Sequence, residues 1–120
     1  LRNSWLIMKE DCIFCKISKG EIESKKVYED DNFIGILDVN PVVEGHTLII
    51  PRGHYKKIFD LPSSLGGELL DAIKNVSLDM IKEGKAESVN LAVVGEDVDH
   101  CHVHVIPRKE GDGVKIVSKE

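Results

Sequence analysis

The sequence predicts a single α+β domain built on an antiparallel sheet of about five strands, with one long and one short helix. Three observations support this fold class. The chain has 120 residues, which suits one hydrophobic core and is too short for two. Short β-rich runs cluster with brief connections, and strands and helices do not alternate regularly. A single long amphipathic stretch separates the β-rich runs into two groups.

The boundaries of the expected elements follow from glycine, proline and turn residues. Gly20 and Gly84 are expected to end the two helices, because glycine readily adopts the backbone conformation that closes a helix. Pro41 and Pro51 follow two of the β-rich runs and end them. In chain order, we expect a helix at 12–19, strands at 27–29, 33–37 and 46–50, a helix at 63–83, and strands at 89–93 and 100–106.

The long helix is predicted from one apolar stripe at helical spacing. Asp60 or Ser63 is expected to cap its start. The stripe is compatible with packing inside the domain and equally with packing against a second copy of the chain. Its members are Leu65, Leu69, Ala72, Ile73, Val76 and Met80.

Composition and charge exclude several classes of protein. Hydrophobic residues make up 42% of the chain and charged residues 31%, as in an ordinary globular protein and unlike a disordered or collagen-like chain. The formal net charge is -5, so non-specific nucleic-acid binding is disfavoured, because it needs a surplus of Lys and Arg. No apolar run approaches the roughly 18 residues of a membrane span, so no membrane partner is expected.

The start of the chain and the cysteine count favour a cytoplasmic location. Residues 1–11 make a poor signal peptide, and we expect them to be a disordered or extraneous extension. The domain is then expected at 12–110, with a short tail at 111–120. Three cysteines are an odd number, so reduced thiols or a metal site are expected instead of a disulfide framework.

Three of the five histidines, His100, His102 and His104, occupy every second position of the last β-rich run. On a strand these positions share one face, and the apolar residues between them share the other. Three interpretations are open: a polar strand facing solvent, a metal site, or nucleophilic catalysis at phosphorus. In the last of these, one imidazole attacks while its neighbours bind the oxyanion or protonate the leaving group.

The other residues that carry chemistry are weak signals when each is taken alone. Cys12 and Cys15 form a Cys-x-x-Cys pair, which is compatible with redox chemistry, zinc or coincidence. His46 lies at the start of a β-rich run and His54 lies just after it, where a lone histidine is more often structural.

Taken together, these segments resemble the histidine triad (HIT) superfamily of nucleotide hydrolases and transferases, and most closely its small Hint-like branch. Residues 100–106 meet the pattern His-φ-His-φ-His-φ-φ, in which φ is apolar. The resemblance runs from about Cys12 to Arg108 and implies the HIT fold in a homodimer. The segments similar to the nucleoside-binding half of the family are 12–17, 27–31, 36–41 and 45–51.

The resemblance implies a catalytic role for three histidines. His102 would attack the α-phosphorus of a nucleotide and form a covalent nucleotidyl-histidine, from which water releases the nucleoside monophosphate. His104 would bind phosphate oxygens and assist the leaving group, and His46 would support the nucleophile. The implied substrate is a purine nucleotide of the AMP type, either a nucleoside 5′-phosphoramidate or an adenylyl compound similar to a dinucleoside polyphosphate.

The resemblance also implies which residues bind the nucleoside and a metal ion. Asp38 would accept hydrogen bonds from the ribose hydroxyls. A structural zinc ion would complete the site, because four protein ligands fill a tetrahedral coordination sphere. No organic cofactor is implied. The apolar residues beside the base would be Ile13, Phe14, Ile17, Ile22 and Val39, and the zinc ligands would be Cys12, Cys15, His54 and His100.

The sequence departs from the family pattern just before the triad. Residues 93–99 form a short acidic loop without the Asn and Gln side chains that hold phosphate in most Hint-like members. Acidic groups near a phosphate are unfavourable. Three alternatives therefore stay open: a nucleotide-binding HIT protein with little turnover, a zinc-stabilised interaction protein that uses the dimer as a scaffold, and an aprataxin-like enzyme that removes adenylate from nucleic-acid ends. The negative net charge makes the aprataxin-like activity the weaker enzymatic alternative.

Overall fold

The computed structural model describes residues 11–95 and 98–115. A short helix, three strands, a long helix and two strands follow one another in the predicted order. Two short 3₁₀ turns, at Ile58–Asp60 and Ser63–Leu65, lead into the long helix. The elements are α1 (Ile13–Ser18), β1 (Lys26–Glu29), β2 (Phe33–Leu37), β3 (Thr47–Pro51), α2 (Gly66–Lys82), β4 (Ser88–Ala92) and β5 (Val103–Arg108).

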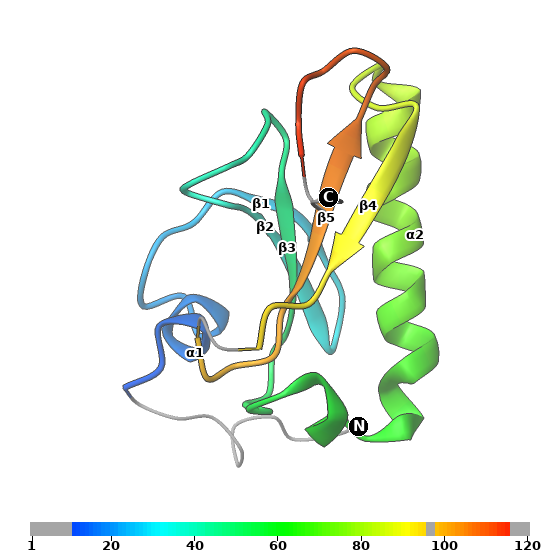
Figure 1. Cartoon of the computed structure of the whole chain (residues 1–120). Coiled ribbons are helices and arrows are strands. Elements are labelled where there is room, and N and C mark those ends of the chain that lie inside the picture. The colour runs from blue at the N-terminus through cyan, green and yellow to red at the C-terminus, as the bar shows by residue number, and fades with distance from the viewer. Residues whose placement is uncertain (1–10, 96–97, 116–120) are drawn as a thin grey trace.

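All five strands form one antiparallel sheet in the order β1-β2-β3-β5-β4. Figure 1 shows α2 along one side of this sheet and α1 on the opposite side. The fold class is therefore the predicted one, an α+β domain with an antiparallel sheet, one long helix and one short helix. Because β5 lies between β3 and β4, the last strand of the chain is an interior strand with a partner strand on each side.

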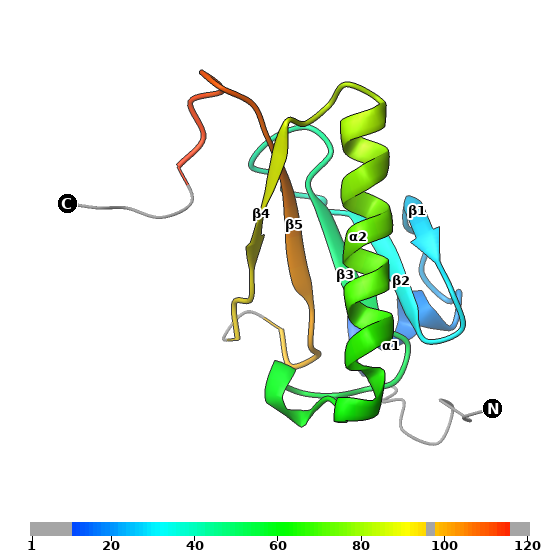
Figure 2. The ribbon, with the colours of Figure 1, turned by 90° about the vertical axis from the view of Figure 1, so that its right-hand side faces the viewer.

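The alternation of side chains along β2 and β3 divides the core into two clusters, one on each face of the sheet. Phe33 and Ile49 point toward α2, whereas Ile34 and Leu48 point toward α1. Gly35 lies where β1, β2 and β3 approach closely: a Cβ there would lie 3.2 Å from both Ile49 Cδ1 and Tyr28 Cβ. Figure 2 shows α2 running across its face of the sheet.

The long helix begins later than predicted and without the predicted cap. Residues 63–65 form a 3₁₀ turn, α2 starts at Gly66, and no side chain caps it, so the predicted capping roles of Asp60 and Ser63 are wrong. Asp60 instead accepts a hydrogen bond from the Lys57 N–H, 3.0 Å away. Gly84 ends the helix as predicted, with a φ of 75° that suits glycine. The predicted stripe packs inside the domain, where Leu65, Ala72, Val76 and Met80 are buried.

The last strand also begins later than predicted. β5 starts at Val103, so of the three histidines only His104 lies on the strand. His100 and His102 belong to the segment that enters it, and both are buried, so the interpretation of a solvent-facing strand is wrong. The physical reason lies in their hydrogen bonds: the His100 imidazole binds Cys12 and the Pro51 carbonyl at the end of β3, and the His100 carbonyl binds the His102 side chain, so this carbonyl is used outside a regular strand ladder.

The sequence predicted an N-terminal extension, a C-terminal tail and an acidic loop before His100, and the structure describes these three segments only in part. Residues 1–10 and 116–120 lie outside the described residues, and so do Glu96 and Asp97 of the acidic loop. The described part of the tail is held against the sheet, because Arg108 donates to both carboxylate oxygens of Asp112, at 2.8 and 3.0 Å. Within the described ranges, no helix combines the length and apolar character needed to cross a membrane.

Candidate active site and metal centre

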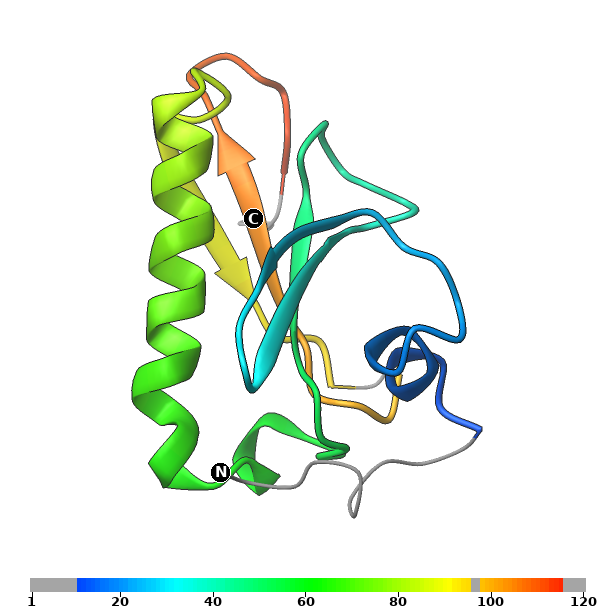
Figure 3. The ribbon, with the colours of Figure 1, turned by 180° about the vertical axis from the view of Figure 1, so that it is seen from behind.

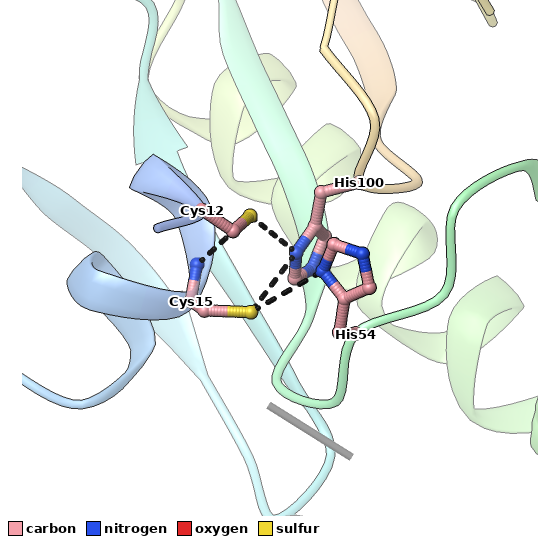
Figure 4. A group of neighbouring side chains, drawn as sticks. All are labelled: Cys12, Cys15, His54 and His100. Atoms are coloured by element: carbon pink, nitrogen blue, oxygen red, sulfur yellow. Dashed lines mark hydrogen bonds between the residues drawn. The ribbon is translucent and has the colours of Figure 1, made fainter. Parts of the chain in front are cut away.

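Two cysteines and two histidines from distant parts of the chain meet at the base of the sheet. Cys12 caps the N-terminus of α1 and Cys15 lies one turn later, so the Cys-x-x-Cys spacing brings both sulfurs to the same side of the helix. His54 follows β3, and His100 precedes β5. Figure 4 shows both sulfurs directed at the two imidazoles. Their ligand atoms all lie within 4.8 Å of one another.

The distances in this cluster fit a tetrahedral zinc ion. The Cys12 and Cys15 sulfurs lie 3.2 and 3.5 Å from His100 Nδ1, and Cys15 Sγ lies 3.4 Å from His54 Nδ1. Zn–S bonds of about 2.3 Å and Zn–N bonds of about 2.0–2.1 Å at tetrahedral angles place sulfur and nitrogen about 3.6 Å apart. Two thiols and two imidazoles leave no coordination position open for water, so the cluster fits a structural zinc site, as predicted.

The imidazole of His100 is oriented as a metal ligand requires. Its Nε2 lies 2.9 Å from the Pro51 carbonyl, and a carbonyl only accepts, so Nε2 carries the proton and Nδ1 keeps its lone pair toward the sulfurs. Burial lowers the pKa of His100 to about 4, which keeps the ring neutral at pH 7. The Phe14 and His100 rings pack edge to face, with ring centroids 5.7 Å apart.

His102 has the opposite arrangement, with Nδ1 occupied. Its Nδ1 lies 2.8 Å from the backbone carbonyl of His100, so Nδ1 donates and Nε2 keeps a lone pair. This is the tautomer that a nucleophilic imidazole needs. The Phe14 ring packs against His102, with ring centroids 5.2 Å apart, and limits the ring's freedom to turn. The His100 carbonyl therefore connects His100, a member of the Cys/His cluster, directly to His102, whose role as nucleophile stays a prediction.

A third arrangement joins His46, at the start of β3, to His104 on β5. The backbone N–H of Val42 donates to His46 Nδ1 at 3.1 Å, and His46 Nε2 lies 2.8 Å from His104 Nδ1. Burial lowers the pKa of His46, so the ring is neutral and its single proton is on Nε2. His46 therefore donates to His104 Nδ1, and the proton of a neutral His104 is on Nε2.

Asp38 approaches the same pair of rings without making a metal site with them. Its Oδ2 lies 3.4 Å from His46 Nε2 and 3.9 Å from His104 Nδ1, so one carboxylate and two imidazoles form a compact group. A metal ion would need a lone pair on His46 Nε2, which carries the proton because Nδ1 accepts from Val42. The hydrogen bonds of this group therefore favour proton donation toward His104 over metal binding.

One cleft of about 680 Å³ connects these groups to the apolar residues of α1 and β2. Every residue predicted to act on the nucleotide lies along it, including His46, His102, His104, Asp38 and Val39. Their functional roles stay predictions, but the fold places them together. The cleft also includes residues that the sequence did not single out, of which Ile36 and Leu48 follow from strand alternation, whereas Ser24, Lys25 and Val98 carry no sequence signal.

The described part of the acidic loop is held by a lysine. Lys57 donates to the Gly95 carbonyl, and its Nζ lies 3.5 Å from Asp99 Oδ1. Asp99 therefore has a cationic partner outside the cleft lining, and its charge is balanced locally. The unfavourable interaction with phosphate that the sequence indicated does not arise from Asp99 in this arrangement.

A family model of the HIT domain matches residues 19–111. The chain belongs to the HIT domain family. The match covers more than half of the sequence and includes all five strands of the sheet and all residues from Asp38 to His104 that line the cleft. The resemblance drawn from the motifs is therefore confirmed.

Curated members of the HIT family are similar over most of this chain. An uncharacterized HIT-like protein of Methanocaldococcus jannaschii is 42% identical over 109 residues, covering 85% of this chain and 82% of that protein. Adenylylsulfatase HINT3 of Arabidopsis thaliana is 40% identical over 88% of this chain, which spans only 56% of that protein. Adenosine 5′-monophosphoramidase HNT1 of Candida albicans is 36% identical, over 82% of this chain and 71% of that protein. These names place the chain on the Hint-like branch.

Solved structures of HIT proteins share the fold. A HIT family protein from Bacillus subtilis aligns with a TM-score of 0.82 at 36% identity, over 92% of this chain and 83% of its own. A zinc-bound histidine triad protein from Mycobacterium smegmatis aligns with the same TM-score at 31% identity, over 94% of this chain and 82% of its own. Five antiparallel strands with one long helix are therefore the HIT fold.

Proposed function

We propose that this HIT protein hydrolyses a nucleoside 5′-phosphoramidate or a related adenylyl compound at the α-phosphorus, with His102 as the nucleophile. One observation carries the proposal. The His100 carbonyl holds His102 Nδ1–H, so a nucleophilic Nε2 is retained beside a cleft that also contains a carboxylate suited to ribose. The similarity to proteins named adenylylsulfatase and adenosine 5′-monophosphoramidase supports an adenylyl substrate.

The reaction has two steps. In the first, the lone pair of His102 Nε2 forms a bond to phosphorus while the bond from phosphorus to the leaving nitrogen or oxygen breaks. The leaving group keeps that electron pair and takes a proton from solvent. In the second step, water adds its oxygen to phosphorus and gives a proton to solvent, the bond to Nε2 breaks, and the nucleoside monophosphate leaves.

The groups around His102 stabilise the charge that develops on the phosphate and hold the nucleotide in place. His104 Nε2–H donates a hydrogen bond to a phosphoryl oxygen, where negative charge grows in the transition state. His46 Nε2–H donates to His104 Nδ1, which keeps the proton of His104 on Nε2. Asp38 accepts from the ribose hydroxyls through its carboxylate, whose Oδ1 is already oriented by the Asn40 N–H at 2.9 Å. Cys12, Cys15, His54 and His100 would hold zinc, which supplies a rigid anchor for the segment that carries His102.

Trapping the intermediate tests this function. The protein is mixed with adenosine 5′-phosphoramidate, quenched rapidly without acid, and examined by intact-protein mass spectrometry. We expect an adenylyl adduct on the wild-type chain, located by peptide mapping to His102. If AMP is released without a detectable adduct, the intermediate is short-lived and the His102→Ala variant decides: full turnover in that variant would contradict His102 as the nucleophile. Binding of AMP without any turnover would instead favour a nucleotide-binding protein.

We also propose that two copies of the chain pair along β4. This strand is an edge of the sheet, so its outer backbone groups have no strand partner in the described chain, and Leu91 on it is exposed. Leu70, Leu78 and Ile81 form an exposed apolar stripe on the outer side of α2. A second copy would cover both features by extending the sheet and pairing the helices.

Light scattering after size exclusion tests the dimer. We expect about twice the 13.4 kDa chain mass for the wild type and the mass of one chain for a Leu78→Lys/Ile81→Lys double variant. Phe59→Lys is the control, because Phe59 is an exposed apolar residue on a separate 3₁₀ turn and should leave the dimer intact. A wild-type protein that elutes with the mass of one chain would overturn the proposal.

A further inference from the structure

Asp38 and His46 lie directly opposite each other where β2 and β3 leave their connection. The Asp38 N–H donates to the His46 carbonyl at 2.9 Å, which extends the β2–β3 pairing by one step. Opposite side chains of an antiparallel pair share one face of the sheet and lie close together. His104 lies on the same face, because its partner Leu48 is two residues beyond His46. Figure 3 shows the connection, residues 38–46, at the end of the sheet opposite to the 3₁₀ turns.

One oxygen of the Asp38 carboxylate faces the hydrogen bond between the two imidazoles. His46 Nε2 lies 2.8 Å from His104 Nδ1, and Asp38 Oδ2 lies 3.4 Å from the first nitrogen and 3.9 Å from the second. The side chains of Asp38, His46 and His104 are 16%, 4% and 12% exposed. Water therefore screens the carboxylate from the rings only weakly, while Asp38 itself lines the cleft and is reachable from it.

These distances give one proton two acceptors. His46 Nδ1 accepts from the Val42 N–H, so the single proton of this neutral ring is on Nε2. His104 Nδ1 is the nearer acceptor, and the negatively charged Asp38 Oδ2 is the second. Burial lowers the pKa of His46 and the charge of Asp38 opposes that effect, so the carboxylate acts on this ring. Its attraction for the Nε2–H weakens the hydrogen bond that holds the tautomer of His104.

We propose that binding of the ribose hydroxyls to Asp38 commits the His46 proton to His104, so that the ribose promotes the chemical step as well as binding. The inference rests on the proposed function, because it needs a nucleotide with its ribose at Asp38 and its phosphate at His104. A hydroxyl that donates to Oδ2 occupies a lone pair and reduces the attraction of the carboxylate for the His46 Nε2–H. His104 is then held with its own proton on Nε2. Asp38 is thus a positioning residue that favours ribonucleotides over their 2′,3′-dideoxy analogues.

Nitrogen NMR of isotope-labelled histidine rings tests the commitment without any reaction. Adenosine and 2′,3′-dideoxyadenosine are each added to saturation, and neither carries a phosphate that would itself bind His104. We expect adenosine to shift His104 toward the tautomer with the proton on Nε2, and 2′,3′-dideoxyadenosine to leave the tautomer unchanged. The same response to both nucleosides, no response to bound adenosine, or failure of adenosine to bind would overturn the inference.

Two carboxylate variants separate this effect from a general change in charge. Asp38→Asn keeps the size of the side chain and an acceptor for ribose but removes the charge, so His104 should hold its proton on Nε2 before any nucleoside is added. Glu44→Gln is the matched control, because Glu44 is an exposed carboxylate of the same connection that does not line the cleft. It should keep the wild-type response to adenosine, and loss of the response in this variant would contradict a specific role of Asp38.

Single-turnover rates measure the consequence for the reaction. At saturation, adenosine 5′-phosphoramidate is expected to react about three- to tenfold faster than its 2′,3′-dideoxy analogue, the range for one neutral hydrogen bond, and the difference should disappear in Asp38→Asn. Ribose hydroxyls that change only KM would overturn this inference and leave the proposed function standing. If the wild type turns over neither compound, the proposed function fails, and this inference fails with it.

Discussion

Replacing His102 with Asn is expected to lower turnover of adenosine 5′-phosphoramidate by at least about 10³-fold, because loss of a nucleophile typically costs that much or more. Asn keeps a polar group of similar reach but has no ring lone pair to attack phosphorus. Neither His100 nor His46 replaces it: His100 uses Nδ1 toward the cysteines and Nε2 toward Pro51, and His46 uses both nitrogens in hydrogen bonds. Single-turnover rates and the AMP dissociation constant are the measurements.

The AMP dissociation constant of the His102→Asn variant should stay within a few-fold of the wild-type value, because Asp38 and the apolar lining remain. Cys101→Ala is the matched control. Cys101 is the adjacent residue with a nucleophilic side chain, but burial raises the pKa of its thiol to about 11, so it is not a thiolate at pH 7. Near-normal turnover in the His102 variant would exclude it as the nucleophile. Loss of turnover in a folded Cys101→Ala protein would contradict the assignment equally.

The fold was predictable from the sequence where side-chain periodicity decides the structure. Alternation in β2 and β3 predicts two buried faces, and the stripe on α2 predicts its packed side, because burial follows directly from these spacings. The start of α2 was not predictable in this way. Asp60 and Ser63 are good cap residues, but the chain uses them in 3₁₀ turns, where tertiary packing of Leu65 overrides the local preference.

Residue types in the sequence predicted which side chains come together in the site, but the sequence did not predict the hydrogen bonds between them. The motifs indicated which histidines come together at the cleft and in the Cys/His cluster, yet the regular strand expected at 100–106 hides the separation of His100 from His102. That separation arises from partners distant in sequence, Pro51 and the Cys-x-x-Cys pair, which no local pattern contains. The Val42 N–H that fixes His46 is a backbone group, and backbone groups carry no sequence signal.

Removing zinc is expected to lower the melting temperature by at least about 10 °C, because structural zinc contributes directly to folding free energy and each kcal/mol shifts the midpoint of a domain this size by several degrees. The four ligands come from the start of α1, the segment after β3 and the segment before β5. Losing the ion frees all three segments at once. Thermal unfolding with and without a strong chelator, together with metal content by mass spectrometry, measures the effect.

Cys15→Ala separates loss of the metal site from loss of a buried thiol. It should bind less than one zinc per chain and melt at the chelated wild-type temperature, whereas Cys101→Ala, also buried, should keep both zinc and chelator sensitivity. A wild-type protein without bound zinc, whose melting temperature ignores the chelator, would contradict the structural site. Because His100 offers its ring to the metal site and its carbonyl to His102 Nδ1, zinc loss should also broaden the orientation of the nucleophile. A zinc ion would thus hold the His100 carbonyl in place against His102 Nδ1 without taking part in the proposed reaction.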